Sequence, residues 1–379
     1  MGAPGNPVRG PVLGNLRLPA EWEPHAATWI TWPQNPRDWP GKFQPMPWAF
    51  AEIIRKIANS EDSERVRVLV GSAATLHRAE AQLNKAHVDV SRVDFFVIPT
   101  DRGWMRDCGP CFVERVGERV GERVGERANE RDGENEGRIV ISGFGFDAWS
   151  KYQDFTLDAA VPRTIAGLMG FDLTPVTRQG RLVTFEGGAL DTNGRGTLVT
   201  TEECCLDPLV QVRNPGFTHA DYEAVFAEAL GITNAIWLAN GIKGDDTHGH
   251  VDDFCRFVNA TTMVLCQEPD PGDPNHAILE ENRELLEAAR LEDGSRPEVI
   301  RLPMPAPLYF DGQRLPASYA NFLITNAAVL VPTFNDVSDR LALGILAEAF
   351  DRPVIGIHAV DLVWGLGTIH CLTRQEPAG

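Results

Sequence analysis

The chain has 379 residues, of which 43% are hydrophobic and 23% are charged, a composition typical of soluble globular proteins. This length suffices for one large domain or for two to three smaller ones, with a core that needs no disulfide or metal to hold it. Because 53 acidic residues exceed 35 lysines and arginines, the net charge is −18, which disfavours nucleic acid and anionic membranes as partners.

The N-terminal residues lack the basic stretch and apolar run of a signal peptide, and no apolar run approaches the roughly 18 residues of a membrane span. The seven cysteines follow no framework spacing, which indicates reduced thiols. We therefore predict a cytoplasmic protein.

Apolar residues recur at helical spacing in several segments, which predicts helices over residues 46–60, 73–88, 219–231, 276–291 and 338–350. Short β-type runs lie between them, with predicted strands at residues 65–70, 94–99, 138–143, 182–188, 196–201, 262–266, 327–332 and 352–357. Helices and strands are mixed along the whole chain, so the predicted class is α/β or α+β.

The segment over residues 113–138 differs in composition from the rest of the chain. The unit Val-Gly-Glu-Arg occurs three times in residues 116–127, and the glycine of each unit disfavours a helix by roughly 1 kcal/mol. With little apolar area to bury, the segment is predicted to be a solvated excursion between two strands, with a charged partner-binding arm as the alternative. The predicted organisation is a flexible tail over residues 1–17 and a single catalytic domain over 18–376, with the repeat inserted at about 115–137.

The stretch GDDTHGHVDDF, residues 244–254, concentrates carboxylates and imidazoles. His248, His250 and Asp252 alternate, and in an extended segment their side chains would point to one side, as in the H-x-H-x-D run of metal-dependent hydrolases. Zinc requires three or four ligands, and the other histidines form no second metal-like cluster in the sequence. A metal-dependent hydrolase is therefore an alternative, and the favoured interpretation has no metal and no other cofactor.

Two cysteine patterns carry different expectations. Cys108 and Cys111 form a C-x-x-C pattern, but they precede a strand-like run and enclose a proline, so two small thiols at a turn are favoured over a redox pair. Cys371 follows a loop in which Gly365 and Gly367 allow close approach of the backbone to a ligand, and it is a candidate nucleophile if a histidine can serve as acid and base.

Several carboxylates accompany this thiol at the ends of predicted strands. They suit a planar cation, because a guanidinium group presents a fork of N–H donors that matches carboxylates in bidentate fashion. The candidates are Asp107, Glu186, Asp245, Asp246 and Asp252.

Eight ordered motifs give the chain a resemblance to a known family. The sequence resembles the agmatine deiminase and bacterial-type peptidylarginine deiminase family of guanidino-group-modifying enzymes from about residue 18 to residue 375. The motifs are PAEWEPHAATWITWP, WMRDCGP, FEGGAL, TTEECCL, GDDTHGHVDDFCRFV, ASYANFLITN, VPTFNDVSDRLALGIL and GTIHCLTRQ. The resemblance implies a five-bladed, pseudo-symmetric α/β propeller of ββαβ units, the pentein type, with the site at its centre.

The same resemblance implies a role for each candidate. Cys371 would attack the guanidinium carbon, and His250 would act as general acid and base. Asp107 and Asp252 would clasp the guanidinium nitrogens, while Glu186 would orient His250. Further substrate contacts would come from Trp104, Asp245, Asp246, Gly367 and Thr368.

The implied reaction is the metal-free hydrolysis of a C–N bond in a linear amidine, converting agmatine to N-carbamoylputrescine and ammonia. Peptidylarginine or another guanidine is the alternative substrate, and the oligomeric state is left open, a homo-oligomer included. The family loop before the cysteine usually reads Gly-Gly-Gly-Asn-Ile-His-Cys, so Leu366 and Thr368 depart from it. Asp246 stands where the family has Glu, and His248 where it has Asn, which leaves the exact substrate open.

Overall fold

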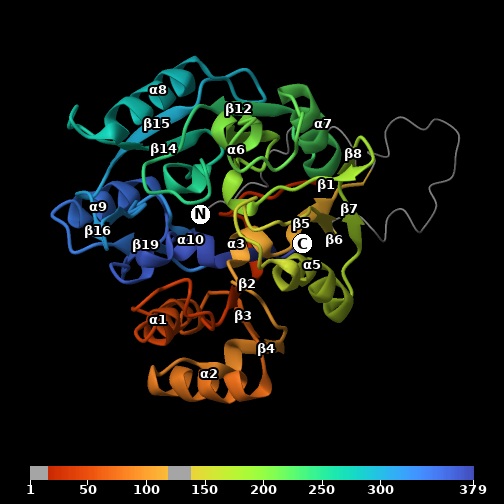
Figure 1. Cartoon of the computed structure of the whole chain (residues 1–379), viewed down its shortest axis with the longest axis vertical. Coiled ribbons are helices and arrows are strands. Elements are labelled where there is room, and N and C mark those ends of the chain that lie inside the picture. The colour runs from red at the N-terminus through yellow and green to blue at the C-terminus, as the bar shows by residue number, and fades with distance from the viewer. Residues whose placement is uncertain (1–15, 118–137) are drawn as a thin grey trace, which may run out of the picture.

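The computed structural model describes residues 16–117 and 138–379 (Figure 1). Most of the predicted N-terminal tail and the repeat over residues 118–137 therefore lie outside the described residues. The predicted tail was too long at its C-terminal end, because Leu16–Arg17 form strand β1, which pairs antiparallel with β5 (Cys111–Arg115).

Five sheets of the described structure share one plan. In the clearest case, β5 pairs antiparallel with β6 (Ile139–Gly143), and helix α5 (Thr156–Met169) then leads to β7 (Leu173–Pro175), which lies parallel to β6. Each unit is therefore a ββαβ motif, and the crossover helix covers its own sheet. The same order recurs in three further units. The first consists of β10 (Asp191–Thr192), β11 (Thr197–Thr201), α6 (Glu202–Leu206), α7 (His219–Leu230) and β12 (Asn234–Leu238). The second consists of β13 (Cys255–Phe257), β14 (Thr262–Gln267), α8 (Pro274–Ala288) and β15 (Glu298–Pro303), and the third of β18 (Leu323–Ile324), β19 (Val329–Thr333), α9 (Asp339–Ala349) and β20 (Val354–His358).

The fifth unit joins the two ends of the chain. The C-terminal strand β21 (Thr373–Pro377) pairs antiparallel with β2 (His25–Thr31), and α1 (Met46–Ala58) leads on to β3 (Arg65–Val70), which is parallel to β2. Helix α2 (Ala73–Lys85) then adds a further parallel strand, β4 (Val93–Val97). The predicted propeller of five ββαβ units is confirmed, and the short helices α3 (Met105–Cys108) and α10 (Ile369–Leu372) lie near its centre (Figure 1).

Local sequence explains most of these elements. Ser72 caps α2, and Thr218 forms a capping box with Asp221 at the start of α7, so both helices begin where their first N–H groups find an acceptor. Helix α5 was missed, because Pro162 in its interior removes a backbone donor and argues against a helix. Buried Val161 and Ile165 hold this helix to the core, so tertiary packing overrides the local signal.

The predicted strand over residues 182–188 is present only in part, because Thr184 forms an isolated parallel β-bridge with Gly145 and the pairing goes no further. Only Arg181–Leu182 form a strand, β9, paired with β8 (Thr177–Arg178), and Gly187–Ala189 form a 3₁₀ turn. This segment runs as a loop toward the centre of the propeller, where it delivers Glu186. Among the described residues, no helix is long and apolar enough to cross a membrane.

Candidate active site

A cavity of about 220 Å³ opens at the centre of the propeller. Its walls come from loops that follow or precede strands of different units, which is where rigid scaffolds commonly place functional side chains. The lining residues are Arg37, Asp38, Pro40, Arg102, Trp104, Asp107, Trp149, Tyr152, Asp246, Thr247, Gln313, Trp364, Gly365, Leu366 and Cys371.

Cys371 lies on α10 with 5% of its surface exposed, at the cavity wall. Its Sγ accepts a hydrogen bond of 3.0 Å from Asn321 Nδ2 and lies 3.7 Å from Asp252 Oδ2. Burial raises the pKa of this thiol well above its ordinary value, and the charges of Asp252, Asp253 and Asp107 raise it further. The resting residue is therefore a thiol, which a cation beside it would help to deprotonate.

Asp252 is fully buried next to that thiol, on the 3₁₀ turn Val251–Asp253. Its Oδ2 lies 2.6 Å from Nδ1 of His370, whose Nε2 lies 2.7 Å from Glu21. Burial alone would raise the pKa of Asp252, but His370, with smaller contributions from His250 and Arg256, lowers it below its ordinary value. The other oxygen, Oδ1, has no hydrogen-bond partner among the described residues, so it is available to a donor in the cavity.

Asp107 presents a second carboxylate from α3. Its Oδ1 accepts from the backbone N–H of Gly188 at 2.9 Å, and its Oδ2 accepts from the indole N–H of Trp149 at 3.0 Å. Burial raises the pKa of Asp107, His250 lowers it, and the nearby acids Asp252 and Glu186 raise it. A bound guanidinium would relieve that accumulation of negative charge.

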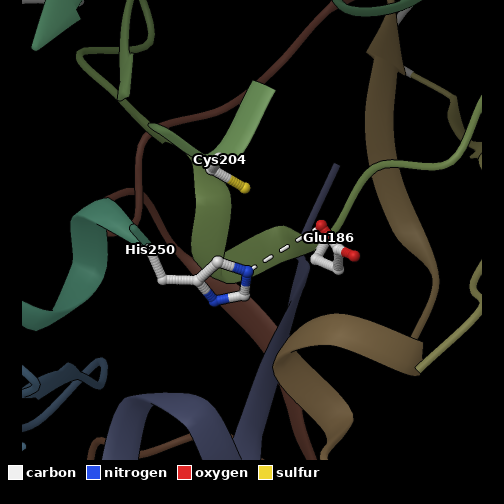
Figure 2. Close-up of side chains that lie close together, drawn as sticks. All are labelled: Glu186, Cys204 and His250. Carbon is white, nitrogen blue, oxygen red and sulfur yellow. Dashed lines mark ion pairs between the residues drawn. The ribbon is translucent and has the colours of Figure 1, made fainter. Parts of the chain in front are cut away.

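His250 and Glu186 are both fully buried, behind Asp107, and point toward each other (Figure 2). His250 Nε2 lies 3.8 Å from Glu186 Oε2, and His250 Nδ1 lies 3.8 Å from Asp107 Oδ1. Burial alone would lower the pKa of His250, but the charge of Asp107, with smaller contributions from Cys204 and Glu186, raises it well above its usual value. Burial opposes ionisation of Glu186, yet Arg213, whose Nε lies 3.1 Å from Oε1, and His250 lower its pKa to about 2.

The four residues Asp107, His250, Asp252 and Cys371, called the inner group below, thus bring together a thiol, an imidazole and two carboxylates. Of the five predicted catalytic residues, Asp107 and Cys371 line the cavity, and Glu186, His250 and Asp252 are fully buried. The buried three remain close to the lining residues, because His250 Nδ1 lies 3.8 Å from Asp107 and Asp252 Oδ2 lies 3.7 Å from Cys371. Their catalytic roles remain predictions.

Among the predicted substrate contacts, Trp104 lines the cavity, and its ring stacks on Trp39 with centroids 5.5 Å apart. A Cβ added to Gly367 would lie 2.8 Å from Trp104 and 3.0 Å from Cys371, so only glycine fits there. Thr368 is buried and donates to Asn321 Oδ1 at 2.7 Å, which makes it a support for the loop. The departing residue Leu366 adopts a left-handed conformation, with φ of 68°, and lines the cavity.

Asp246 also lines the cavity, but its carboxylate already has partners. Lys151 forms an ion pair with Oδ1, and the hydroxyl of Tyr152 donates to Oδ2 at 2.7 Å. Nearby, Arg102 pairs with Asp38 at 2.9 Å. Asp38, Arg102, Lys151 and Asp246, called the outer group below, are therefore a set of matched charges at the other part of the cavity.

Asp245 does not fit the predicted role of a substrate contact. Its Oδ1 accepts from the N–H and hydroxyl of Thr247 at 2.7 and 2.6 Å, and its Oδ2 accepts from the N–H groups of Gly249 and His250 at 2.7 and 3.1 Å. This carboxylate shapes the loop that carries His250, because both of its oxygens already accept hydrogen bonds from that loop. The sequence alone could not show which of the two adjacent acids, Asp245 or Asp246, faces the cavity.

The alternative metal site of His248, His250 and Asp252 is also wrong. The segment is not extended, because His248 has a φ of 65° and Gly249 a φ of 94°, so the alternation does not place the three side chains on one side. His248 Nε2 lies 2.9 Å from Asp207 instead.

Several residues of the site were not predicted. Asn321 donates to the sulfur of Cys371, His370 supports Asp252, and Arg213 holds Glu186. Asn321 and His370 stand inside motifs that carry the family resemblance, so the motifs themselves were the signal. Cys108 and Cys111 are both buried and free, at the end of α3 and the start of β5.

Comparison with known proteins agrees with this geometry. The sequence model of the Porphyromonas-type peptidyl-arginine deiminase family matches residues 17–377. The chain belongs to this family. The predicted resemblance is therefore confirmed, and the match covers almost all of the described residues.

Relatives in the family are similar over nearly their whole length. Agmatine deiminase of Pseudomonas aeruginosa (strain LESB58) is 32% identical over 98% of this chain and 98% of its own. Agmatine deiminase of Ectopseudomonas mendocina (strain ymp) is 33% identical over 97% of each chain. The structure of an agmatine deiminase of Enterococcus faecalis superimposes with a TM-score of 0.81 at 27% identity and covers 96% of both chains.

Proposed function

We propose that this protein is an agmatine deiminase, which hydrolyses agmatine to N-carbamoylputrescine and ammonia through a covalent intermediate on Cys371. The observation that carries the proposal is the inner group, in which a buried thiol lies near two buried carboxylates and an imidazole, and one carboxylate oxygen, Asp252 Oδ1, has no donor among the described residues. A guanidinium cation supplies the missing N–H donors and the missing positive charge together. The agmatine deiminase names of relatives above 30% identity support the choice of substrate.

Substrate binding prepares the nucleophile. The guanidinium lies between Asp107 and Asp252, so its carbon faces the sulfur of Cys371. Because burial and three acids raise the pKa of the free thiol, the cation lowers it again and favours the thiolate. Trp104 covers the planar group, since its ring lines the same cavity.

The first half of the reaction releases ammonia. The thiolate of Cys371 attacks the guanidinium carbon and forms the C–S bond of a tetrahedral adduct. His250, which carries a proton because its pKa is raised, gives that proton to the departing nitrogen as the C–N bond breaks. An S-alkylthiouronium group remains on Cys371.

The second half uses water. His250, now neutral, takes a proton from a water molecule as the oxygen attacks the thiouronium carbon. The C–S bond then breaks, the ureido product leaves, and Cys371 returns to its starting state. Glu186, held by Arg213, orients His250 through both steps. The proposal retains the predicted cytoplasmic location and a small cationic guanidine as partner.

The test offers the purified protein agmatine, free arginine and an arginyl peptide, and measures ureido product and ammonia. Agmatine is expected to give the highest kcat/KM, and Cys371→Ser serves as the matched inactive control. Turnover of another guanidine without turnover of agmatine would refute the substrate. Loss of turnover with EDTA and its recovery with Zn²⁺ would refute the thiol mechanism.

A further inference from the structure

A third buried side chain lies beside the acid–base pair of the site. Cys204, on α6, lies next to His250 and Glu186, and one ligand atom of each of the three residues lies within 4.8 Å of the others. Figure 2 shows the sulfur facing the space between the imidazole and the carboxylate. Cys204 is 4% exposed and takes no part in the proposed reaction.

Polar atoms that face this space lack hydrogen-bond partners. Glu186 Oε2 and His250 Nε2 lie 3.8 Å apart as an ion pair, but neither has a hydrogen-bond partner among the described residues, although both side chains are completely buried. Buried polar atoms are nearly always paired, because an unpaired one costs free energy. Two fully buried side chains therefore direct unpaired atoms at a position that a thiol also faces.

The other polar atoms of Glu186 and His250 contact residues that lie outside the cluster. Arg213 lies 3.1 Å from Glu186 Oε1, which leaves Oε2 for another partner. Asp107 Oδ1 lies 3.8 Å from His250 Nδ1, which leaves Nε2 facing Glu186. Metal-binding residues in proteins are commonly held in place by a second layer of polar groups. Here Asp107 lies beside the far nitrogen of His250, and Arg213 holds the far oxygen of Glu186.

The donors themselves select the class of cation. A thiolate, an imidazole nitrogen and a carboxylate oxygen are the ligands of Zn²⁺, whereas Ca²⁺ and Mg²⁺ take oxygen alone. With Zn–N and Zn–O near 2.0 Å and Zn–S near 2.3 Å, the tetrahedral ligand atoms would be roughly 3.3 to 3.5 Å apart. Small inward movements from the present spacing are enough to reach that geometry.

We propose that Glu186, Cys204 and His250 form an inhibitory site for Zn²⁺ or another thiophilic divalent cation. The thiol of Cys204 and the protonated imidazole of His250 each release a proton to solvent as the S–metal and N–metal bonds form, and water fills the fourth position. The charges of the thiolate and the carboxylate balance those of the cation. The bound metal occupies Nε2 of His250, so this imidazole can no longer exchange protons with substrate or water.

A second group of donors has to be excluded experimentally. Asp252, Asp253 and Cys371 also place their ligand atoms within 4.8 Å of one another. That group lacks an imidazole, and its sulfur already accepts a hydrogen bond from Asn321. Replacement of Cys371 by serine removes its sulfur and leaves Cys204 in place.

The experiment titrates Co²⁺, a spectroscopic substitute for Zn²⁺, into the Cys371→Ser protein and records the near-ultraviolet thiolate-to-cobalt band. The band is expected to saturate at one equivalent and to vanish when Zn²⁺ is added. It should be absent from the Cys371→Ser/Cys204→Ser protein, because serine has the same size but no sulfur. Far-UV circular dichroism checks that each variant is folded.

Cys205 provides the matched control, because it is buried one residue further along α6 and lies outside the cluster. The Cys371→Ser/Cys205→Ser protein should keep the band. Absence of the band from the Cys371→Ser protein, or its persistence after Cys204 is replaced, would overturn the site. This binding assay does not depend on which guanidine is the substrate.

Inhibition is measured separately, with Zn²⁺ added to the wild-type and Cys204→Ser enzymes during turnover. Each rate is normalised to that of the same protein without metal. The Zn²⁺ concentration for half inhibition should be at least tenfold higher for Cys204→Ser. Equal inhibition of the two proteins would assign the effect to another site and overturn the inhibitory role.

Discussion

The two parts of the cavity treat charge in opposite ways. In the inner group, buried Asp252 and His250 retain polar atoms without partners, and the pKa of Cys371 is raised well above its ordinary value. In the outer group each acid is paired with a base, Asp246 with Lys151 and Asp38 with Arg102, although Asp38 Oδ2 and Arg102 Nε also lack hydrogen-bond partners among the described residues. The difference lies in the balance of charge: a cluster of buried acids beside a thiol favours binding of a cation, whereas paired charges have to exchange partners when a substrate arrives.

The largest effect should come from the inner thiol. Cys371→Ser is expected to lower kcat by at least about 10⁴-fold, because no other group in the inner group can form the covalent intermediate. The protein should fold normally, since serine fits the same space, and thermal unfolding checks this. Retention of more than a hundredth of the activity would contradict the claim that the inner group carries out the reaction.

The inner carboxylates come next. Asp107→Asn and Asp252→Asn keep the side-chain shape but remove the charge that holds the guanidinium, so each should lower kcat/KM by about 10²- to 10³-fold. Steady-state kinetics with agmatine measures the loss. A change below tenfold in both variants would place guanidinium binding elsewhere.

The pH dependence of alkylation tests the resting state of Cys371. A thiol whose pKa is raised stays protonated at neutral pH, so its thiolate fraction grows about tenfold per pH unit until the pH reaches the raised pKa. Iodoacetamide labelling, followed by peptide mass spectrometry, should rise at this rate through pH 7 to about 9 in the free enzyme. A plateau below pH 8 would show a thiolate at rest.

Substitutions in the outer group should have smaller effects, which change KM and leave kcat unaltered. Lys151→Met removes the cation that competes for Asp246, and a partly exposed ion pair contributes about 0.2 to 1 kcal/mol, so the KM for agmatine should fall by about 1.4- to fivefold. Asp246→Asn should raise this KM. A rise in KM with Lys151→Met would mean that the lysine positions Asp246 for the substrate.

The repeat should matter least. Arg115 N–H donates to the carbonyl of Arg138 at 2.9 Å, so the two ends of the segment meet across the β5–β6 pair, and a short turn can join them. Replacement of residues 118–137 by such a turn should leave kcat/KM within about twofold. A large loss would show that the segment contributes to the site.

The sequence predicted the regular elements better than the geometry of the loops. Apolar periodicity located α1 and β14, because packing in this fold follows the local pattern. It failed at α5, where tertiary contacts hold a helix that contains Pro162. Fivefold closure came only from the family motifs, since no local signal pairs β21 with β2 across the whole chain.

Within the site, the motifs pointed to Cys371, Asp252 and Asp107, whose side chains lie close together in the structure, although their roles stay predictions. They could not distinguish Asp245 from Asp246, because the direction of each side chain depends on how the backbone of the loop turns. In the structure Asp245 faces its own loop, whereas Asp246 faces Lys151. They also could not show that Lys151 reaches Asp246, since the two residues are 95 positions apart. Contacts of this kind depend on how the units close around the centre.

Acid quenching during steady turnover of agmatine labelled at its guanidino carbon tests the central claim most directly. Peptide mapping should find the label bound to Cys371, with the mass of agmatine less ammonia, and no label in the Cys371→Ser protein. Turnover that proceeds with no covalent label on Cys371 at saturating substrate, or with the label on another residue, would contradict the account.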